Sequence, residues 1–176
     1  MGTRAVVIQP INLHDHRGRL VAVLIPLSKG YFATIDAADY AEFGRLNWCA
    51  SGVAGKMYAA RSKRLASGRK TVVRMHNEML PGTPLVDHRN GNGLDNRRRN
   101  IRPATARQNL YNMKKPSSGV TSRFKGVHRA ADTGAWLAQI RYDGKHVHLG
   151  SFATEEEAAE AYRAASEMHH REFARH

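Results

Sequence analysis

The chain has 176 residues, 41% of them hydrophobic, which is enough apolar content for one medium domain or two small ones and excludes wholesale disorder. Its formal net charge of +13 favours an anionic polymer as partner, and its longest apolar run, residues 20–27, is far too short to span a bilayer. The single cysteine, Cys49, excludes an internal disulfide, argues against a cysteine-based zinc site, and is expected to be a buried small hydrophobe.

The first 60 residues predict antiparallel strands. Residues 1–20 are mixed and polar, and we expect their His14-Asp15-His16 triplet to lie in a solvated N-terminal segment rather than to bind a metal. From Leu20 the pattern becomes strand-like, and Ser28-Lys29-Gly30 is a hairpin signal. The expected elements are strands at 21–27 and 31–35, a short helix at 37–43, and two further strands at 48–50 and 57–61.

Positive charge is concentrated in the middle of the chain. Residues 61–129 hold 17 Lys and Arg against 3 Asp and Glu, a net charge of +14, whereas residues 130–176 carry a net −3. A polyanion would therefore lie against the middle segment. Within it, residues 62–70 form a basic loop that is either a solvated hairpin tip or a phosphate contact.

The apolar spacing of residues 71–80 predicts a helix that ends at Pro81 and Gly82. His76 on this helix has two interpretations. It is either a packed, hydrogen-bonded histidine, which we favour, or a contact to phosphate or metal.

A polar stretch follows at residues 86–109. Asp87 and His88 end a short apolar run, and a turn rich in Asn and Gly comes directly after them. Asp87 and Asn109 offer the oxygen ligands that Mg²⁺ or Mn²⁺ prefers, and a neutral imidazole at His88 is a suitable base for an attacking water. Asn100 returns on a second arm, where it can fix the histidine ring. Each feature alone is typical of a surface turn, and their conjunction indicates a site.

Thr105 can cap the next helix, and Asn109 lies about one turn into it. Residues 114–121 then predict a linker, because charge is followed by proline, serine and glycine. After the linker the pattern restarts with three strands and one helix. The expected elements are strands at 124–129, 135–142 and 145–151, and a helix at 155–170 opened by a Thr154/Glu157 capping box, with Ala158, Ala161, Tyr162, Ala165 and Met168 along one face.

Residues 86–102, from Val86-Asp87-His88-Arg89-Asn90 to Asn100-Ile101-Arg102, closely resemble the HNH motif of phage-type homing endonucleases, the ββα-metal nucleases. The resemblance implies His88 as general base, Asn100 as the residue that orients it, and Asp87 and Asn109 as ligands of one Mg²⁺ or Mn²⁺ per active site, without zinc. The neighbouring arginines are expected to contact DNA. They are Arg97, Arg98, Arg99 and Arg102.

Residues 122–175 resemble the ethylene-response-factor (Apetala-two) DNA-binding domain, on segments that include Phe124-Lys125-Gly126-Val127 and His148-Leu149-Gly150-Ser151-Phe152. The resemblance implies that a three-stranded sheet lies in the major groove. Base preference does not carry over, because this chain differs from the plant form at several groove-facing positions. The residues expected to contact DNA are Lys125, His128, Arg129, Trp136, Arg141, His146 and His148.

Together these features predict an α+β protein: N-terminal antiparallel strands leading into a ββα-metal module, then a small three-stranded antiparallel sheet packed on one helix. The expected segments are an N-terminal segment at 1–20, a nuclease domain at 21–113, a linker at 114–121 and a DNA-binding domain at 122–176.

The expected activity is site-specific, metal-dependent cleavage of double-stranded DNA, and the alternative is sequence-specific DNA binding without cleavage, as in a repressor. We expect no membrane and no small-molecule cofactor. The chain is expected in the cytoplasm, as a monomer or a homodimer.

Overall fold

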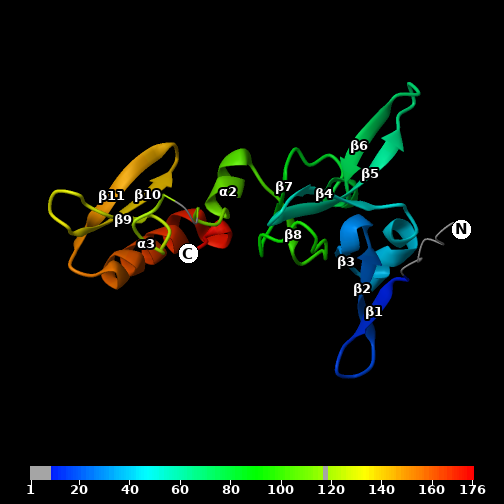
Figure 1. Cartoon of the computed structure of the whole chain (residues 1–176), viewed down its shortest axis with the longest axis horizontal. Coiled ribbons are helices and arrows are strands. Elements are labelled where there is room, and N and C mark those ends of the chain that lie inside the picture. The colour runs from blue at the N-terminus through cyan, green and yellow to red at the C-terminus, as the bar shows by residue number, and fades with distance from the viewer. Residues whose placement is uncertain (1–8, 117–118) are drawn as a thin grey trace, which may run out of the picture. The chain divides into compact units, whose positions relative to one another are not determined.

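The computed structural model describes residues 9–116 and 119–176. The predictions made for residues 1–8, and for Ser117 and Ser118 in the expected linker, lie outside these residues. The chain divides into two compact units, Met1–Ala104 and Thr105–His176. Both are built from small antiparallel sheets with few helices, which confirms a mixed α+β architecture (Figure 1). None of the described helices is long and apolar enough to cross a membrane.

The first unit opens with a three-stranded sheet in the order β1-β2-β3. Its strands are β1 (Ile11–His14), β2 (Leu20–Pro26) and β3 (Phe32–Asp36). The alternation of side chains along the strands points Val23, Ile25 and Ile35 into the core. The expected hairpin forms at Ser28–Gly30. Short helical turns follow β3 at Ala37–Asp39 and Tyr40–Gly44. Part of the expected N-terminal segment is thus a paired strand.

A second sheet, in the order β4-β5-β6, carries a long hairpin and leads into the short helix α1. Their bounds are β4 (Cys49–Val53), β5 (Lys56–Arg64), β6 (Lys70–Arg74) and α1 (Met75–Met79). The helix predicted over 71–80 was therefore wrong in its first half, because residues 70–74 pair with β5 as a strand. Cys49 is exposed, not buried, because the residues on either side of it, Trp48 and Ala50, point into the core.

The polar stretch forms the two-stranded ladder of β7 (Val86–His88) and β8 (Ile101–Pro103). The loop between them docks on β3 through two backbone hydrogen bonds. The amide of Thr34 donates to the carbonyl of Leu94 at 2.8 Å, and the amide of Asn96 donates to the carbonyl of Thr34 at 2.7 Å. The loop is therefore part of the first unit's core rather than an independent turn.

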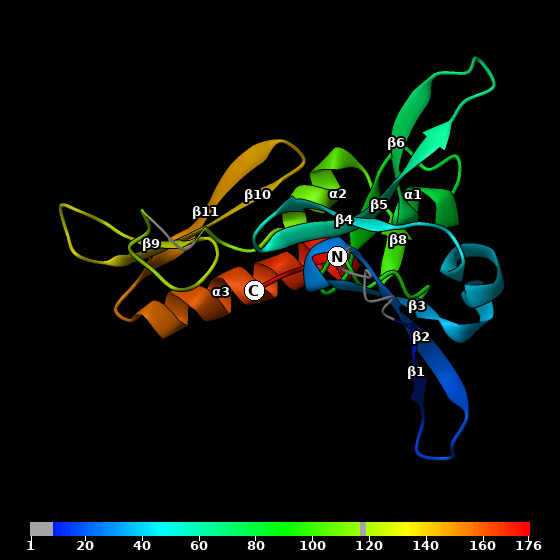
Figure 2. The ribbon, with the colours of Figure 1, turned by 45° about the vertical axis from the view of Figure 1, so that its right-hand side comes forward.

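In the second unit a sheet ordered β11-β10-β9 packs on one long helix, as predicted (Figure 2). Its elements are α2 (Ala106–Tyr111), β9 (Val127–Arg129), β10 (Trp136–Tyr142), β11 (Lys145–Phe152), α3 (Glu155–His170) and a final turn at Arg171–Phe173. The core holds Ala138, Ile140, Ala158 and Tyr162, and the Thr154/Glu157 capping box is present. Met168 was predicted on the packed face, but its side chain is 73% exposed.

Helix α2 packs within the second unit. The Tyr111 ring stacks on the His170 ring with centroids 3.7 Å apart, and Lys125 Nζ donates to the carbonyls of Tyr111 and Met113. Lys115, inside the expected linker, donates to the carbonyls of Phe124 and Val127. The division between the units therefore falls at Ala104/Thr105, ahead of the segment predicted as linker.

Candidate functional site

Asp87 and His88 lie buried at the end of β7, with exposed fractions of 4% and 6%. Asp87 is opposite Arg102 on β8, and His88 is opposite Ile101. Because β7 has only three residues and ends at His88, the acid and the histidine stand where the strand gives way to the loop. An acidic and a basic group are thus held side by side on a short, fixed ladder.

Asp87 forms a buried ion pair with Arg102. The Nε and Nη2 atoms of Arg102 lie 2.8 Å and 2.7 Å from the same carboxylate oxygen, Oδ2, and both side chains are 5% exposed. A buried ion pair is held in one geometry, because separating its two members leaves an unpaired charge in the protein interior. Arg102 therefore fixes the orientation of Asp87. This role of Arg102 is distinct from the DNA contact that was predicted for it.

His88 is enclosed by polar and aromatic neighbours. Its Nε2 lies 3.3 Å from Oδ1 of Asn96, and its ring centroid lies 4.9 Å from that of His76 and 6.0 Å from that of Tyr58. Burial lowers the pKa of His88, although Asn96, Asp87 and Asp95 oppose the shift. The lowered pKa favours the neutral ring, in which one nitrogen donates and the other accepts.

Asn100 acts on the loop rather than on the histidine ring. Its Oδ1 accepts from the amide of Asn90 at 3.0 Å, and its Nδ2 donates to the carbonyl of Asp95 at 2.6 Å. The residue that meets His88 is Asn96, which is fully buried and which sequence reasoning missed. Its only sequence signal was an Asp-Asn pair inside the turn.

The arginine cluster is largely engaged inside the unit. Arg97 binds Asp95 through Nε at 2.7 Å and Nη2 at 2.6 Å, and Arg98 pairs with Asp39 at 2.8 Å. Arg99 is exposed and makes no ion pair within the described part of the chain. The DNA contacts predicted for the four arginines stay predictions.

His76 is packed, as favoured from the sequence, but within the described part of the chain the hydrogen bond expected for its ring is not found at Nδ1. It is 4% exposed, and its ring lies edge-on to those of His88 and Tyr58. Burial, assisted by repulsion from His88 and Arg74, lowers the pKa of His76 to about 3. Its Nδ1 is buried and has no hydrogen-bond partner among the described residues.

The predicted metal ligands are of the right chemical type. A carboxylate and an amide oxygen suit Mg²⁺ or Mn²⁺. Within residues 9–116 and 119–176, no group of three or more His, Cys, Asp and Glu side chains forms a metal cage. Asn109 lies on α2 in the second unit, so its pairing with Asp87 stays a prediction.

The sheet of the second unit turns a polar face away from α3. Cross-strand partners share a face, and the register pairs Leu137 with His128, Gln139 with His148, and Arg141 with His146. The intervening Ala138 and Ile140 are buried against the helix. Four predicted DNA contacts therefore share this outward face, together with Gln139, which was missed although the strand alternation points to it. The four are His128, Arg141, His146 and His148.

Three further predicted DNA contacts lie elsewhere in the unit. Trp136 packs against the core beside Phe152, and the Arg129 guanidinium lies 5.8 Å from the Trp136 ring centroid. The Lys125 ammonium is held by the carbonyls at the end of α2, and burial lowers its pKa to about 8. Their observed contacts support the fold, whereas their predicted contacts to DNA stay predictions.

Comparison with known proteins finds relatives of two kinds, plant transcription factors and a phage protein. Over 67 residues, 35% of this chain, it is 43% identical to the AP2-like ethylene-responsive transcription factors AIL7 and AIL6 of Arabidopsis thaliana. It spans only 14% and 12% of those two proteins. No protein-family model and no solved structure matches the chain.

Over 93 residues the chain is 33% identical to Protein 3.8 of Escherichia phage T7. The match covers 53% of this chain and 76% of the phage protein. Since most of the phage protein is matched at this identity, the chain belongs to the Protein 3.8 family.

Proposed function

We propose that this protein binds double-stranded DNA through the outward face of the β9-β10-β11 sheet. The observation that carries the proposal is the alternation of β10, which buries Ala138 and Ile140 under α3 and leaves Gln139 and Arg141 exposed on the opposite face. The similarity to AP2-like transcription factors supports it.

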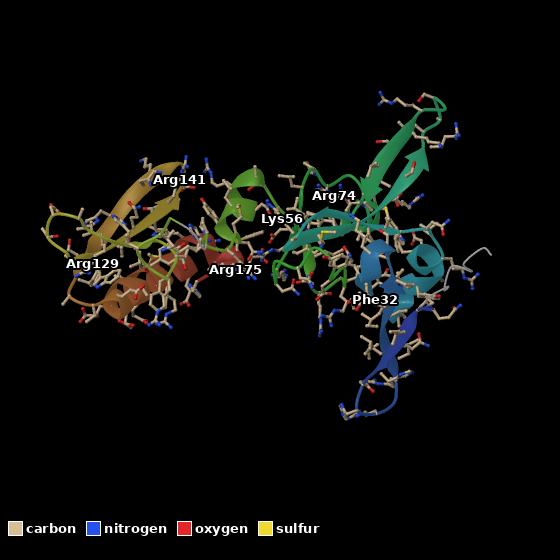
Figure 3. All side chains as sticks on the ribbon, in the orientation of Figure 1. Phe32, Lys56, Arg74, Arg129, Arg141 and Arg175 are labelled. Atoms are coloured by element: carbon tan, nitrogen blue, oxygen red, sulfur yellow. The ribbon has the colours of Figure 1, made fainter. Side chains whose placement is uncertain are left out.

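The face has the chemistry needed to read base edges. Arg141 can form a bidentate contact with guanine, and Gln139 with adenine, in the major groove. His146 and His148 on β11 flank them and offer ring nitrogens to bases or phosphates. Figure 3 labels Arg141 and Arg129 on this unit, and only Arg141 belongs to the outward face.

Binding is tested by selecting sites from a random duplex library with the full chain and then measuring affinity for the selected site. Arg141→Ala is expected to weaken selected-site binding by about 1–3 kcal/mol and to relax preference at one position. The matched control is Arg163→Ala, since Arg163 lies on α3 and pairs with Glu160. Equal losses in the two variants would contradict the proposed face.

A second candidate function is metal-dependent hydrolysis of the bound DNA, with Asp87 and His88 at its centre. What favours it is the placement of a buried carboxylate beside a buried imidazole at the end of β7. The loop that follows is held by Asn100 through hydrogen bonds to Asn90 and Asp95. Asp87 and Asn109 would hold one Mg²⁺ or Mn²⁺, which supplies positive charge to the phosphate oxygens when bound.

The protein's own part in this reaction is to activate water. The neutral His88 ring accepts a proton from the water whose oxygen forms the new bond to phosphorus, while Asn96 contacts the ring at Nε2. The bond from phosphorus to the 3′ oxygen breaks, that oxygen takes up a proton, and the products carry a 5′-phosphate and a 3′-hydroxyl. The arrangement suits a homing-type endonuclease.

Cleavage is tested on supercoiled plasmid carrying the selected site, with Mg²⁺ and with EDTA as a control. Wild type is expected to nick the plasmid, and His88→Ala is expected to bind with unchanged affinity but not to nick. If wild type binds the selected site tightly but nicks the plasmid no more than His88→Ala does, the proposed nuclease activity is contradicted and the proposed DNA binding is not.

A further inference from the structure

The β5–β6 hairpin carries positive charge on both of its faces. The register places Arg61 opposite Val73 and Lys63 opposite Thr71 on one face. On the other face it places Arg64 opposite Lys70, and Ala60 opposite Arg74. The hairpin extends well beyond the rest of the first unit (Figures 1 and 2).

On one face both cations are paired within the protein. Glu78 on α1 lies 2.7 Å from Arg61 Nε and 2.8 Å from Lys63 Nζ. These two cations hold the pKa of Glu78 below its usual range, although desolvation opposes the shift. The charge on this face therefore has an internal partner.

The other face has no such partner. Arg64, Lys70 and Arg74 are exposed, and in the described part of the chain none of them pairs with a carboxylate. Arg64 Nη1 donates only to the neutral carbonyl of Gly68, at 3.0 Å. Like charges directly opposite each other on paired strands are destabilising, so the Arg64/Lys70 pair costs the hairpin stability without compensation inside the fold.

This face is continuous with the candidate site. Tyr58 lies on the same face of β5, two residues before Ala60, and the Arg74 guanidinium is 4.6 Å from its ring centroid. The Tyr58 ring is in turn 6.0 Å from that of His88. Figure 3 labels Arg74 at the base of the hairpin.

The length of the face fits a stretch of duplex. Arg64 lies six residues after Tyr58 on β5, a distance of about 20 Å at ~3.3 Å per residue. One strand of B-DNA places a phosphate every ~3.4 Å along the helix axis, so the face spans about six phosphates.

We propose that Arg64, Lys70 and Arg74, here called the basic strip, bind the phosphate backbone of duplex DNA and guide it along the hairpin to His88. The inference rests on the proposed DNA binding and adds a second contact surface, in the first unit. It is independent of sequence reading, because phosphate contacts are made to any duplex.

The test measures the affinity of the full chain for a random-sequence duplex of 30 base pairs at several salt concentrations. The strip variant carries Arg64→Gln, Lys70→Gln and Arg74→Gln. Each lost phosphate contact lowers the slope of log K against log salt by about 0.9, so its slope is expected to fall by roughly 2 to 3. Its melting temperature is expected to equal or exceed that of wild type, since a like-charge pair is removed.

The matched control carries Arg17→Gln, Lys29→Gln and Arg45→Gln, which remove the same charge from exposed positions of the same unit. Its slope is expected to change by less than 1. Equal slope losses in the two variants, or an unchanged slope in the strip variant, would overturn the inference while leaving DNA binding intact. Failure of the wild-type chain to bind any duplex would overturn both.

Discussion

Asp87 contributes both to the stability of the first unit and to the geometry of the candidate site. Its carboxylate is 4% exposed and faces the Arg102 guanidinium, and removing one member of such a pair typically costs about 3–5 kcal/mol. Arg102→Leu is expected to lower the unfolding free energy of the first unit by about 3 kcal/mol. Urea unfolding followed through Trp48, in a Trp136→Phe background, measures this unit alone.

The double variant Asp87→Leu, Arg102→Leu provides the check. With both charges removed, at least half of the lost stability is expected to return, because no buried ion is left. A double variant no more stable than Arg102→Leu would mean that the ion pair is not the origin of the loss.

His76 makes the first unit sensitive to acid. The folded protein keeps this ring neutral with a pKa of about 3, whereas the unfolded chain protonates it near 6.5. Between these values the unfolded state binds the extra proton, so stability falls as the pH drops below about 6.5. At pH 5 the loss from this residue is about 2 kcal/mol relative to pH 7.

His76→Phe keeps the aromatic packing and removes the titrating group. The difference in unfolding free energy between pH 7 and pH 5 is expected to shrink by about 2 kcal/mol, with the part due to His88 remaining. The exposed His146→Gln serves as control, measured by the same urea unfolding. An undiminished pH difference in His76→Phe would contradict the assignment.

At the scale of elements, the loop between β7 and β8 depends on Asn100. Replacing a buried hydrogen-bonding side chain costs about 1–3 kcal/mol, so Asn100→Ala should raise exchange of the Asn90 amide roughly tenfold to a hundredfold. Hydrogen exchange by NMR measures this directly. Asn92→Ala, which removes an exposed acceptor from the same loop, should leave the Asn90 amide unchanged.

At this scale the sequence predicted those elements whose formation depends on residues close together in the chain. The capping box at Thr154 and the hairpin at Ser28–Gly30 both follow from short local patterns and both formed. Residues 70–74 did not follow their helical spacing, because pairing with β5 outweighed local propensity. The partner strand lies elsewhere in the chain, so no local pattern could reveal it.

The same limit applies to the candidate site. Asp87 and His88 were found from an adjacent pair of residue types, and the structure buries both. Asn96, which meets the His88 ring, was missed because that contact depends on how the loop folds back. The ion pair between Arg98 and Asp39 was also missed, because the two residues are far apart in the sequence. The DNA contact predicted for Arg98 stays a prediction.

At the scale of the whole molecule, positive charge and metal-ligand chemistry are divided between two units. The basic strip and Asp87 belong to the first, whereas Asn109 and the outward sheet face belong to the second. Helix α2 carries the predicted metal ligand Asn109. It also packs within the second unit through the stacking of Tyr111 on His170.

The packing of α2 predicts where the chain can be divided. A fragment of residues 105–176 keeps the Tyr111–His170 stack and the two carbonyls that accept from Lys125, whereas a fragment of residues 114–176 loses all of them. Leaving the half-buried Lys125 ammonium without these acceptors, together with the lost stacking, should cost about 2–3 kcal/mol.

For a domain of this size, that cost corresponds to a melting temperature lower by roughly 10–20 °C in the shorter fragment, measured by circular dichroism. Lys125→Met in the longer fragment separates the two contributions, because it removes the buried charge and keeps the ring stack. Equal melting temperatures for the two fragments would show that α2 does not stabilise the second unit, and the boundary would then belong in the segment 114–121.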